Sequence, residues 1–198
     1  MKRKVEILVL SDIHLGTKNC KATELLTYLK SIKPNIIILN GNFIETKNFK
    51  NLVGDHLRVF GRLVKLLTQG SRIYYLSGEI DAPLRRFADF SNGQLFLRDQ
   101  LVLKLGGKKY WFLHGNLLIP PQYPDDSWSS RKLVQWFFNR FFSKNTLQNR
   151  NFEQRVTEIA MEEGYDTVVC GYTRTPKMDN INGVEYFNAG DWTNHLTA

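Results

Sequence analysis

The sequence contains little cysteine and no long hydrophobic segment. Only two cysteines, Cys20 and Cys170, occur among 198 residues, and they lie far apart. So few cysteines exclude a disulfide framework or a zinc ribbon and are typical of a protein in a reducing cytosol. No apolar run approaches the ~18–20 residues that a membrane span needs, and the basic start leads into an apolar stretch too short for a signal peptide. We therefore expect a cytoplasmic protein, either soluble or attached peripherally to the inner face of the membrane.

Acidic residues are also scarce relative to basic ones. The chain has 19 Asp and Glu against 27 Lys and Arg, which gives a formal charge of +8. Such an excess indicates an anionic partner: a nucleic acid, a phosphorylated ligand or a membrane surface. No nucleic-acid-binding motif is recognisable, and the basic residues are dispersed apart from Lys2–Lys4 and the segment Arg131–Lys144, which disfavours nucleic acid. The sequence points to no particular protein partner.

The first half of the chain alternates strand-like and helix-like segments. Its apolar content of 42% is typical of a folded globular protein and excludes wholesale disorder. An order of strand, helix, strand, helix, strand predicts a parallel sheet with right-handed crossovers. The predicted segments are the strand Val5–Leu10, a helix over Thr23–Ile32 that Pro34 ends, the strand Asn35–Leu39, a helix over Leu52–Thr68 and the strand Arg72–Leu76.

The second half contains hairpins and a group of helices. Turns at Gly106-Gly107 and Asn182-Gly183 predict two β-hairpins. Together the two halves predict one mixed α/β domain over residues 1–198, with a short helical insert near residues 120–150. The predicted segments are strands at Leu95–Leu97, Leu101–Leu105, Lys109–Leu113 and Thr167–Cys170, and helices at about Arg131–Ser143 and Thr146–Glu163.

The loops that follow the predicted strands contain polar residues and glycines. Ligands of open α/β sheets bind at the carboxyl ends of the strands, so these loops are the candidate site. Asp12 and His14 offer an oxygen and a nitrogen ligand suited to Zn, Mn or Fe. The pattern is short, and it is equally typical of an Asp that caps a loop beside a packed His. The recurrence of glycine at several strand ends favours the metal interpretation.

Two motifs resemble a known family. The segment Ser11–Thr17, followed by Asn19–Ala22, resembles the first motif of calcineurin-like metallophosphoesterases. The segment Tyr186–Trp192 resembles the Gly-Asp-Trp signature of the UDP-2,3-diacylglucosamine pyrophosphohydrolase branch, whose enzymes act in lipid A synthesis. The motifs keep the same order over nearly the whole chain. The resemblance implies a four-layer α/β/β/α metallophosphoesterase-type sandwich, two bridged metal ions at the strand ends, and hydrolysis of a phosphate or pyrophosphate ester.

Several residues depart from the ligand pattern that the resemblance implies. Asp12, His14 and His114 stand at retained ligand positions. The departures are Asn42 in place of a bridging Asp, Glu79 in place of an Asn, Ile80 in place of a His or Arg, Asn116 in place of an Asp, and Tyr172 and Arg174 in place of two His.

These departures predict a degenerate metal site. A bridging carboxylate holds two cations ~3.5–4 Å apart by neutralising their repulsion, which the neutral Asn42 cannot do. The guanidinium of Arg174 stays protonated and would lie where a cation belongs. We expect Glu79 to pair with Arg174, and we do not expect the dinuclear metal pair.

Three functions remain open from the sequence. The first is a pseudoenzyme, inactive or impaired, that is retained for ligand binding or regulation. The second is an active phosphoesterase or pyrophosphohydrolase with one Mn or Zn ion held by Asp12, His14, His114 and Glu79, which would activate water. The third is an anion-binding module in which Arg174 and loop N–H groups receive a phosphate. For the ligand we expect a phosphorylated or nucleotide-lipid small molecule, with Arg174 and Asn116 as contacts.

The segment Arg131–Lys144 predicts a basic amphipathic helix. Its apolar half is rich in aromatic residues, and its polar half carries most of the basic residues. We expect Trp136, Phe137 and Phe141 to face lipid, with affinity for anionic membrane surfaces. The alternative is that the aromatic face docks on the sandwich. The family resemblance supports lipid contact, since the insert helices of that branch cap an acyl-chain pocket.

Overall fold

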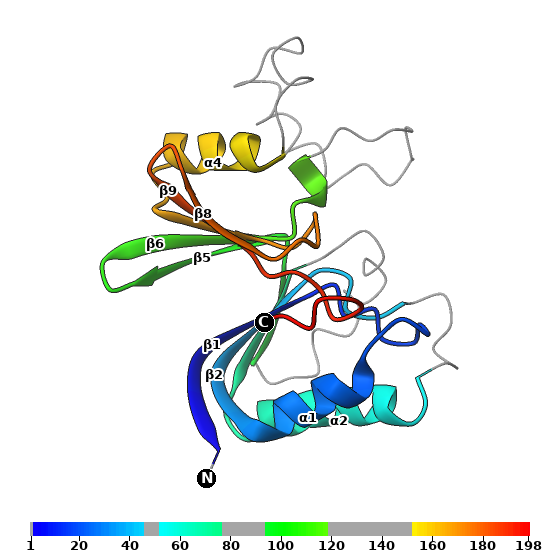
Figure 1. Ribbon diagram of the computed structural model, residues 1–198. Coiled ribbons are helices and arrows are strands. Elements are labelled where there is room, and N and C mark those ends of the chain that lie inside the picture. Colours follow the sequence, from blue (N-terminus) through cyan, green and yellow to red (C-terminus); the bar gives the residue numbers. More distant parts are fainter. Residues whose placement is uncertain (1, 46–51, 77–93, 119–151) are drawn as a thin grey trace.

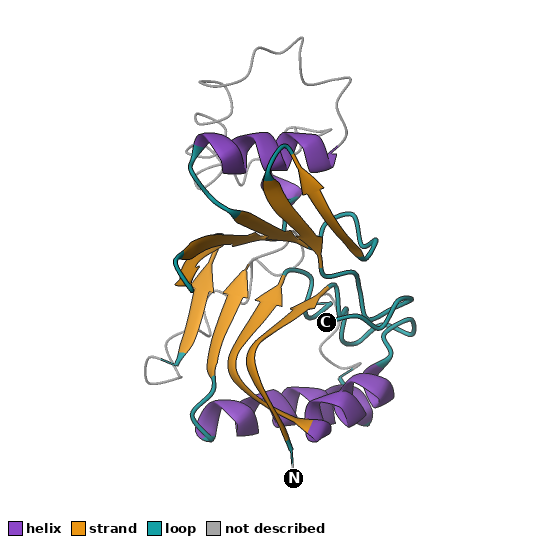
Figure 2. Ribbon diagram, turned by 60° about the vertical axis from the view of Figure 1, so that its left-hand side comes forward, coloured by secondary structure: helices purple, strands orange, loops and turns teal. Residues whose placement is uncertain are grey.

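Two β-sheets lie face to face at the centre of the structure, between two layers of helices (Figure 1). The computed structural model describes residues 2–45, 52–76, 94–118 and 152–198. Figure 2 shows helices below the first sheet and a further helix above the second. This arrangement confirms the predicted four-layer α/β/β/α sandwich. The predicted insert near residues 120–150, including Arg131–Ser143, lies outside the described residues.

The first sheet is parallel and has the strand order β1-β2-β3-β4. The predicted parallel sheet is therefore confirmed. Pro34 lies inside a strand rather than before it, at a position where β2 pairs with β1 but β3 has not yet begun, so a missing N–H is tolerated. The elements are β1 (Arg3–Ser11), α1 (Ala22–Ser31), β2 (Ile32–Asn40), α2 (Asp55–Thr68), β3 (Arg72–Leu76) and β4 (Leu95–Arg98).

The second sheet is mixed and has the order β5-β6-β7-β9-β8. Both predicted hairpins are confirmed, because β5 pairs with β6 and β8 with β9 in antiparallel fashion. Asn182 and Gly183 have φ values of 55° and 85°, as a tight hairpin turn requires. The elements are β5 (Gln100–Leu105), β6 (Lys108–Leu113), the 3-10 helix η3 (Asn116–Leu118), α4 (Phe152–Glu162), β7 (Thr167–Cys170), β8 (Lys177–Ile181) and β9 (Val184–Asn188).

Three apolar clusters join the four layers. One lies between α1, α2 and the first sheet, a second between the two sheets, and a third between the second sheet and α4. The strands of the first sheet are apolar on both faces because both faces are covered, which explains their continuous Val, Ile and Leu runs. None of the helices in the described parts of the chain is long and apolar enough to cross a membrane.

Candidate functional site

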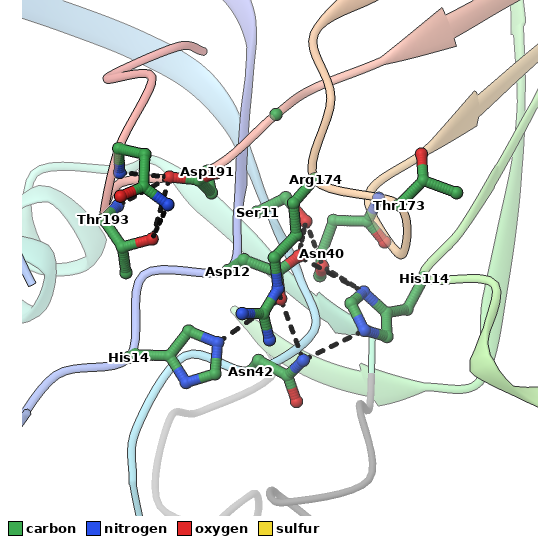
Figure 3. Close-up of polar contacts among 12 residues, drawn as sticks. Ser11, Asp12, His14, Asn40, Asn42, His114, Thr173, Arg174, Asp191 and Thr193 are labelled. Carbon is green, nitrogen blue, oxygen red and sulfur yellow. Dashed lines mark hydrogen bonds and ion pairs between the residues drawn. The ribbon is translucent and has the colours of Figure 1, made fainter. Parts of the chain in front are cut away.

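The polar residues predicted from the sequence meet at the carboxyl ends of strands from both sheets (Figure 3). Asp12 and His14 follow β1, and Asn42 follows β2. His114 follows β6 and Arg174 follows β7. The parallel pairings of β1 with β2 and of β6 with β7 bring these ends to the same edge of the sandwich. The fold thus assembles five of the predicted residues into one cluster, which we call the Asp12 cluster.

The backbone of this cluster is held in an unusual conformation. Asp12, His14, Asn42 and Arg174 have φ values of 48°, 52°, 50° and 56°. They account for four of the six non-glycine residues with positive φ in the described part of the chain. Such left-handed conformations are costly for side chains other than Gly, Asn and Asp, and they gather at functional sites. The fold therefore imposes these conformations on the cluster.

Asp12 is the fully buried centre of the cluster. Its Oδ1 accepts hydrogen bonds from Asn42 Nδ2 at 2.9 Å and from Arg174 Nε at 2.9 Å, and its Oδ2 accepts one from Ser11 Oγ at 2.8 Å. Burial alone would raise the pKa of Asp12, but the contact with His14 and the hydrogen bonds from Asn42 and Ser11 hold the pKa below its usual range. Asp12 is thus a carboxylate at neutral pH.

The imidazole of His114 has a defined orientation. Its Nδ1 lies 2.9 Å from the backbone oxygen of Asn40, which can only accept, so Nδ1 carries the proton. Nε2 then accepts a hydrogen bond from Asn42 Nδ2 at 3.1 Å. Gly41 makes this packing possible, because a Cβ at that position would lie 2.3 Å from the His114 ring. The ring is therefore a neutral imidazole with its lone pair directed at the Asn42 amide.

The Asn42 amide group thus lies between the carboxylate of Asp12 and the imidazole of His114. Its two N–H groups donate to Asp12 Oδ1 and His114 Nε2. Its own Oδ1 is buried without a hydrogen-bond partner among the described residues, and so is His14 Nε2, which is 3.4 Å from Asp12 Oδ1. Buried polar atoms normally have hydrogen-bond partners, so these two atoms can contact a bound ligand or water.

Arg174 joins the cluster from the loop that follows β7 of the second sheet. Its Nε–Asp12 Oδ1 contact is an ion pair, while 45% of the Arg174 side chain remains exposed. The predicted partner Glu79 lies outside the described residues, as does Ile80, so the expected Glu79–Arg174 pair stays a prediction. The guanidinium lies among Asp12, His14 and Asn42 in Figure 3.

Two further predicted residues lie at the margin of the site. The Tyr172 ring packs edge-on against His114, with ring centroids 5.9 Å apart, and its backbone N–H donates to the His114 oxygen. Tyr172 therefore forms an aromatic wall behind the imidazole. Asn116 begins η3 and is half-buried. The predicted lipid-facing residues Trp136, Phe137 and Phe141 lie outside the described residues.

The described donors do not fit a pair of divalent cations. The described residues contain no group of three or more His, Cys, Asp or Glu side chains placed to hold a metal ion. Around its one buried carboxylate, the cluster places two imidazoles, a neutral amide and a guanidinium 2.9 Å from the carboxylate. Two metal ions need several anionic ligands to offset their mutual repulsion.

Sequence reasoning gave no role to Ser11 or Asn40. The Ser11 hydroxyl group contacts Asp12 Oδ2 and the Asn40 backbone oxygen, and the same oxygen orients His114. The position of Ser11 directly before Asp12 could have predicted the contact between them. No sequence signal could have predicted the role of the Asn40 backbone oxygen, because every residue has this atom.

The chain belongs to the calcineurin-like phosphoesterase superfamily. The family model of the calcineurin-like phosphoesterase superfamily domain matches residues 5–198. A weaker similarity links the chain to the UDP-2,3-diacylglucosamine hydrolase of Aliivibrio fischeri (strain MJ11), with 22% identity that covers 94% of this chain and 90% of that protein.

Solved structures share the fold at low sequence identity. A novel archaeal phosphodiesterase matches with a TM-score of 0.54 and 16% identity, over 96% of this chain and 87% of that one. Vps29 of Entamoeba histolytica, solved in complex with Zn²⁺, matches with a TM-score of 0.50 and 14% identity, over 94% of this chain and 74% of that one. The resemblance drawn from the sequence motifs is thus confirmed for the superfamily and for the fold.

Proposed function

We propose that this protein is a cytoplasmic metallophosphoesterase-fold protein without the two-metal centre, which binds a phosphate-bearing ligand and does not hydrolyse it. The observation that carries the proposal is the ion pair between Arg174 Nε and Asp12 Oδ1 at 2.9 Å. The Arg174 guanidinium is a cation that belongs to the chain itself. It neutralises the buried Asp12 carboxylate, which would otherwise bind a metal ion.

The charges in the cluster support this function. The Arg174 guanidinium keeps its proton at any accessible pH, so a divalent cation at Asp12 would meet a fixed like charge. At a separation of about 4 Å, the repulsion between a divalent and a monovalent cation is about 8 kcal/mol near a protein surface, taking an effective dielectric constant of about 20. The Asn42 amide also occupies the lone pairs of Asp12 Oδ1 and His114 Nε2 that a metal would need.

The exposed part of Arg174 suggests what the site binds. Nε contacts Asp12, and the remaining guanidinium N–H groups have no hydrogen-bond partner among the described residues. They are the donors that the site offers to a phosphate, the anion that arginine recognises best. The similarity to a UDP-2,3-diacylglucosamine hydrolase supports a nucleotide-lipid or another phosphorylated small molecule as the ligand. Asn116 is the proposed second contact.

A phosphoesterase with one metal ion is the second candidate, and a specific observation favours it. His14 Nε2 and Asn42 Oδ1 are buried without hydrogen-bond partners in the described residues. A single Mn or Zn ion would satisfy His14 together with Asp12, His114 and Glu79, provided that Arg174 moved away. These oxygen and nitrogen donors suit either metal.

Metal content and hydrolysis test the proposal directly. The purified chain is incubated with excess Mn²⁺ or Zn²⁺, dialysed, and measured by elemental analysis and by assay with UDP-2,3-diacylglucosamine. We expect neither stoichiometric metal nor hydrolysis, and we expect uridine diphosphate to bind at least about tenfold more weakly to the Arg174→Gln variant, since a charge-assisted contact is lost. An Arg98→Gln variant changes an exposed arginine on β4 and is the matched control.

A variant that restores the family pattern sharpens the test. It combines Asn42→Asp, Asn116→Asp, Tyr172→His and Arg174→His, and we expect it to gain bound metal that the wild type lacks. Two equivalents of metal with hydrolysis in the wild type would overturn the proposal. One equivalent that is lost in Asp12→Ala would overturn it in favour of the one-metal enzyme.

A further inference from the structure

The outer face of α2 carries a row of exposed apolar side chains. Val53, just before the helix, is 64% exposed, Leu57 55%, Phe60 42% and Val64 43%. Their spacing of four, three and four residues places them along one side of the helix. We call these four residues the α2 stripe.

The α2 stripe lies outside the core. The opposite face of the helix already fills the core with Val59, Leu63 and Leu66, all of which are buried. The stripe contributes four of the eight large apolar side chains that are exposed in the described part of the chain. The other four are scattered over β5, α4, β8 and the last loop, as single exposed apolar residues ordinarily are. The concentration on one helix indicates a contact surface.

A cluster of positive charge adjoins the end of this helix. The pKa of Lys2 is lowered, first by the charge of Arg62, then by burial, and further by Lys65 and Lys33. Backbone contacts place these residues together, since Arg3 pairs with Ile32 and Arg62 of α2 donates to the Ile32 oxygen at 3.3 Å. Lys2, Lys33 and Lys65 are exposed, and we call these three residues the basic corner. By contrast, the acidic residue of α2, Asp55, is engaged by Arg58 and Thr23.

The shape of this surface also limits what can cover it. Helices α1 and α2 form the outermost layer of the sandwich below the first sheet, and the N-terminus lies beside the same layer (Figures 1 and 2). The α2 stripe is a row of four apolar side chains along one helix of this layer. A complementary partner for the stripe and the basic corner has a deformable surface. This surface accepts apolar side chains and presents negative charge beside them.

We propose that the α2 stripe and the basic corner form a docking surface for anionic lipid bilayers. The stripe enters the interface between head groups and acyl chains, and the three lysines contact lipid phosphates. The surface is independent of the predicted insert helix Arg131–Lys144, and it does not depend on whether the Asp12 cluster binds metal.

Vesicle binding by the full chain tests this proposal. Vesicles of phosphatidylcholine with about one-third phosphatidylglycerol are compared with phosphatidylcholine alone in a sedimentation assay, at low and high salt. We expect binding to anionic vesicles only. The combined variant Leu57→Gln, Phe60→Gln and Val64→Gln should bind at least about tenfold more weakly, since three apolar contacts are lost. The variant Lys2→Gln, Lys33→Gln and Lys65→Gln should lose most of the salt dependence.

Matched controls distinguish binding through this surface from nonspecific adsorption to vesicles. The combined variant Val102→Gln, Met161→Gln and Met178→Gln removes three exposed apolar side chains from other layers and should bind like the wild type. The variant Trp136→Gln, Phe137→Gln and Phe141→Gln tests the lipid contact predicted for the insert in the same way, and its effect should add to the loss in the stripe variant rather than replace it. Thermal unfolding of each variant verifies that it is folded.

A fluorescent label reports insertion directly. Cys20 and Cys170 are buried, and burial raises the pKa of Cys20 to about 12 and that of Cys170 further, so neither should react with a thiol probe. An environment-sensitive probe on Phe60→Cys should shift to the blue with anionic vesicles, and the same probe on Met178→Cys should not.

Three results would overturn the proposal. The first is wild-type protein that does not sediment with anionic vesicles at low salt. The second is loss of binding in the insert variant while the stripe variant binds normally, which would assign the lipid contact to the insert. The third is a dimer, detected by light scattering, that Phe60→Gln dissociates, which would show that a second copy of the chain covers the stripe.

Discussion

Two buried aspartates of this protein, Asp12 and Asp191, are held in opposite ways. The contacts of Asp12 reach across the fold, from Asn42 beyond β2 and from Arg174 beyond β7. The contacts of Asp191 come from its own loop: the backbone N–H groups of Thr193, Asn194 and His195, and the ring of His195 at 2.9 Å. One carboxylate therefore depends on the tertiary structure and the other on adjacent sequence.

This difference distinguishes the Asp12 cluster, which is the candidate site, from the Asp191 loop that supports it. The Asp191 loop is fastened locally, and it in turn holds the Asp12 cluster, since Trp192 N–H donates to the Asp12 backbone oxygen at 3.3 Å. The chemistry of Asp12, by contrast, changes with whichever residues the distant strands deliver. Here they deliver an amide and a guanidinium, so a fold that belongs to a phosphoesterase superfamily surrounds its central carboxylate with internal donors.

The largest expected effect comes from glycines beside the two aspartates. A Cβ at Gly41 would lie 2.3 Å from the buried His114 ring, while one at Gly190 would meet the Thr197 hydroxyl at 2.1 Å and Pro176. The ring cannot move without disturbing the Asp12 cluster, whereas the Thr197 hydroxyl can rotate away at the loss of its hydrogen bond to the Ala189 oxygen. We expect Gly41→Ala to lower the free energy of unfolding by at least about 3 kcal/mol and Gly190→Ala by about 1–2 kcal/mol.

Urea denaturation measures the free energy of unfolding of both glycine variants. Gly70→Ala is the control, because Gly70 also has a positive φ, 96°, but a Cβ there would meet nothing within 4 Å. The free energy of unfolding that Gly70→Ala loses is therefore the cost of the backbone conformation alone, about 1 kcal/mol. Equal losses in Gly41→Ala and Gly70→Ala would contradict the tight packing of His114 on Gly41.

An intermediate effect is expected from acid. Burial alone would raise the pKa of Asp191, but the Asn194 N–H, His195 and Thr193 outweigh it and hold the pKa well below the usual range. A carboxyl with a lowered folded-state pKa stabilises the fold fully above its unfolded-state pKa of about 4, and this contribution is lost as the pH falls below that value. Asp191→Asn should therefore destabilise the protein by about 2 kcal/mol at pH ~7 and by less at pH ~3.

Asp12→Asn is the comparison variant for this measurement. The folded-state pKa of Asp12 is lowered as well, so the sign of the pH dependence is the same. We expect a cost of about 1 kcal/mol at pH ~7, since side-chain donors can rearrange whereas the backbone donors of Asp191 cannot. A cost of Asp191→Asn that did not change between the two pH values would contradict the role given to its charge.

The smallest effect on stability is expected from Arg174. Its side chain is 45% exposed, so water replaces much of what the ion pair supplies, and Arg174→Ala should change the free energy of unfolding by about 1 kcal/mol or less. A thermal melt checks this value. A loss comparable to that of Gly41→Ala would mean that Arg174 supports the fold rather than the ligand site.

Much of the fold was predictable because its signals are local. The strands Arg72–Leu76 and Thr167–Cys170 begin and end where apolar periodicity placed them. Asn182-Gly183 predicted its hairpin because both residues tolerate the left-handed conformation that the turn needs. Pro34 was misplaced, since whether a strand accepts a proline depends on how far its neighbour β3 extends.

The candidate site was only partly predictable. Its members Asp12, His14, Asn42, His114 and Arg174 follow strands, so their meeting at one edge was expected from parallel pairing. The contact between Arg174 and Asp12 was not expected, because the sequence pattern favoured Glu79 as the partner of Arg174 and a pattern carries no distances. The Asp12 contact and the amide between Asp12 and His114 are visible only in three dimensions.

The sequence by itself determined the order of strands and helices, the turns, the local hydrogen bonds of Asp191 and the presence of an arginine at position 174. These depend on neighbouring residues and on side-chain chemistry. The tertiary structure decided which donors surround Asp12, the tautomer of His114 and the exposure of the α2 stripe. Those features depend on groups that the fold brings together from far apart in the chain, and on which helix face the core leaves uncovered.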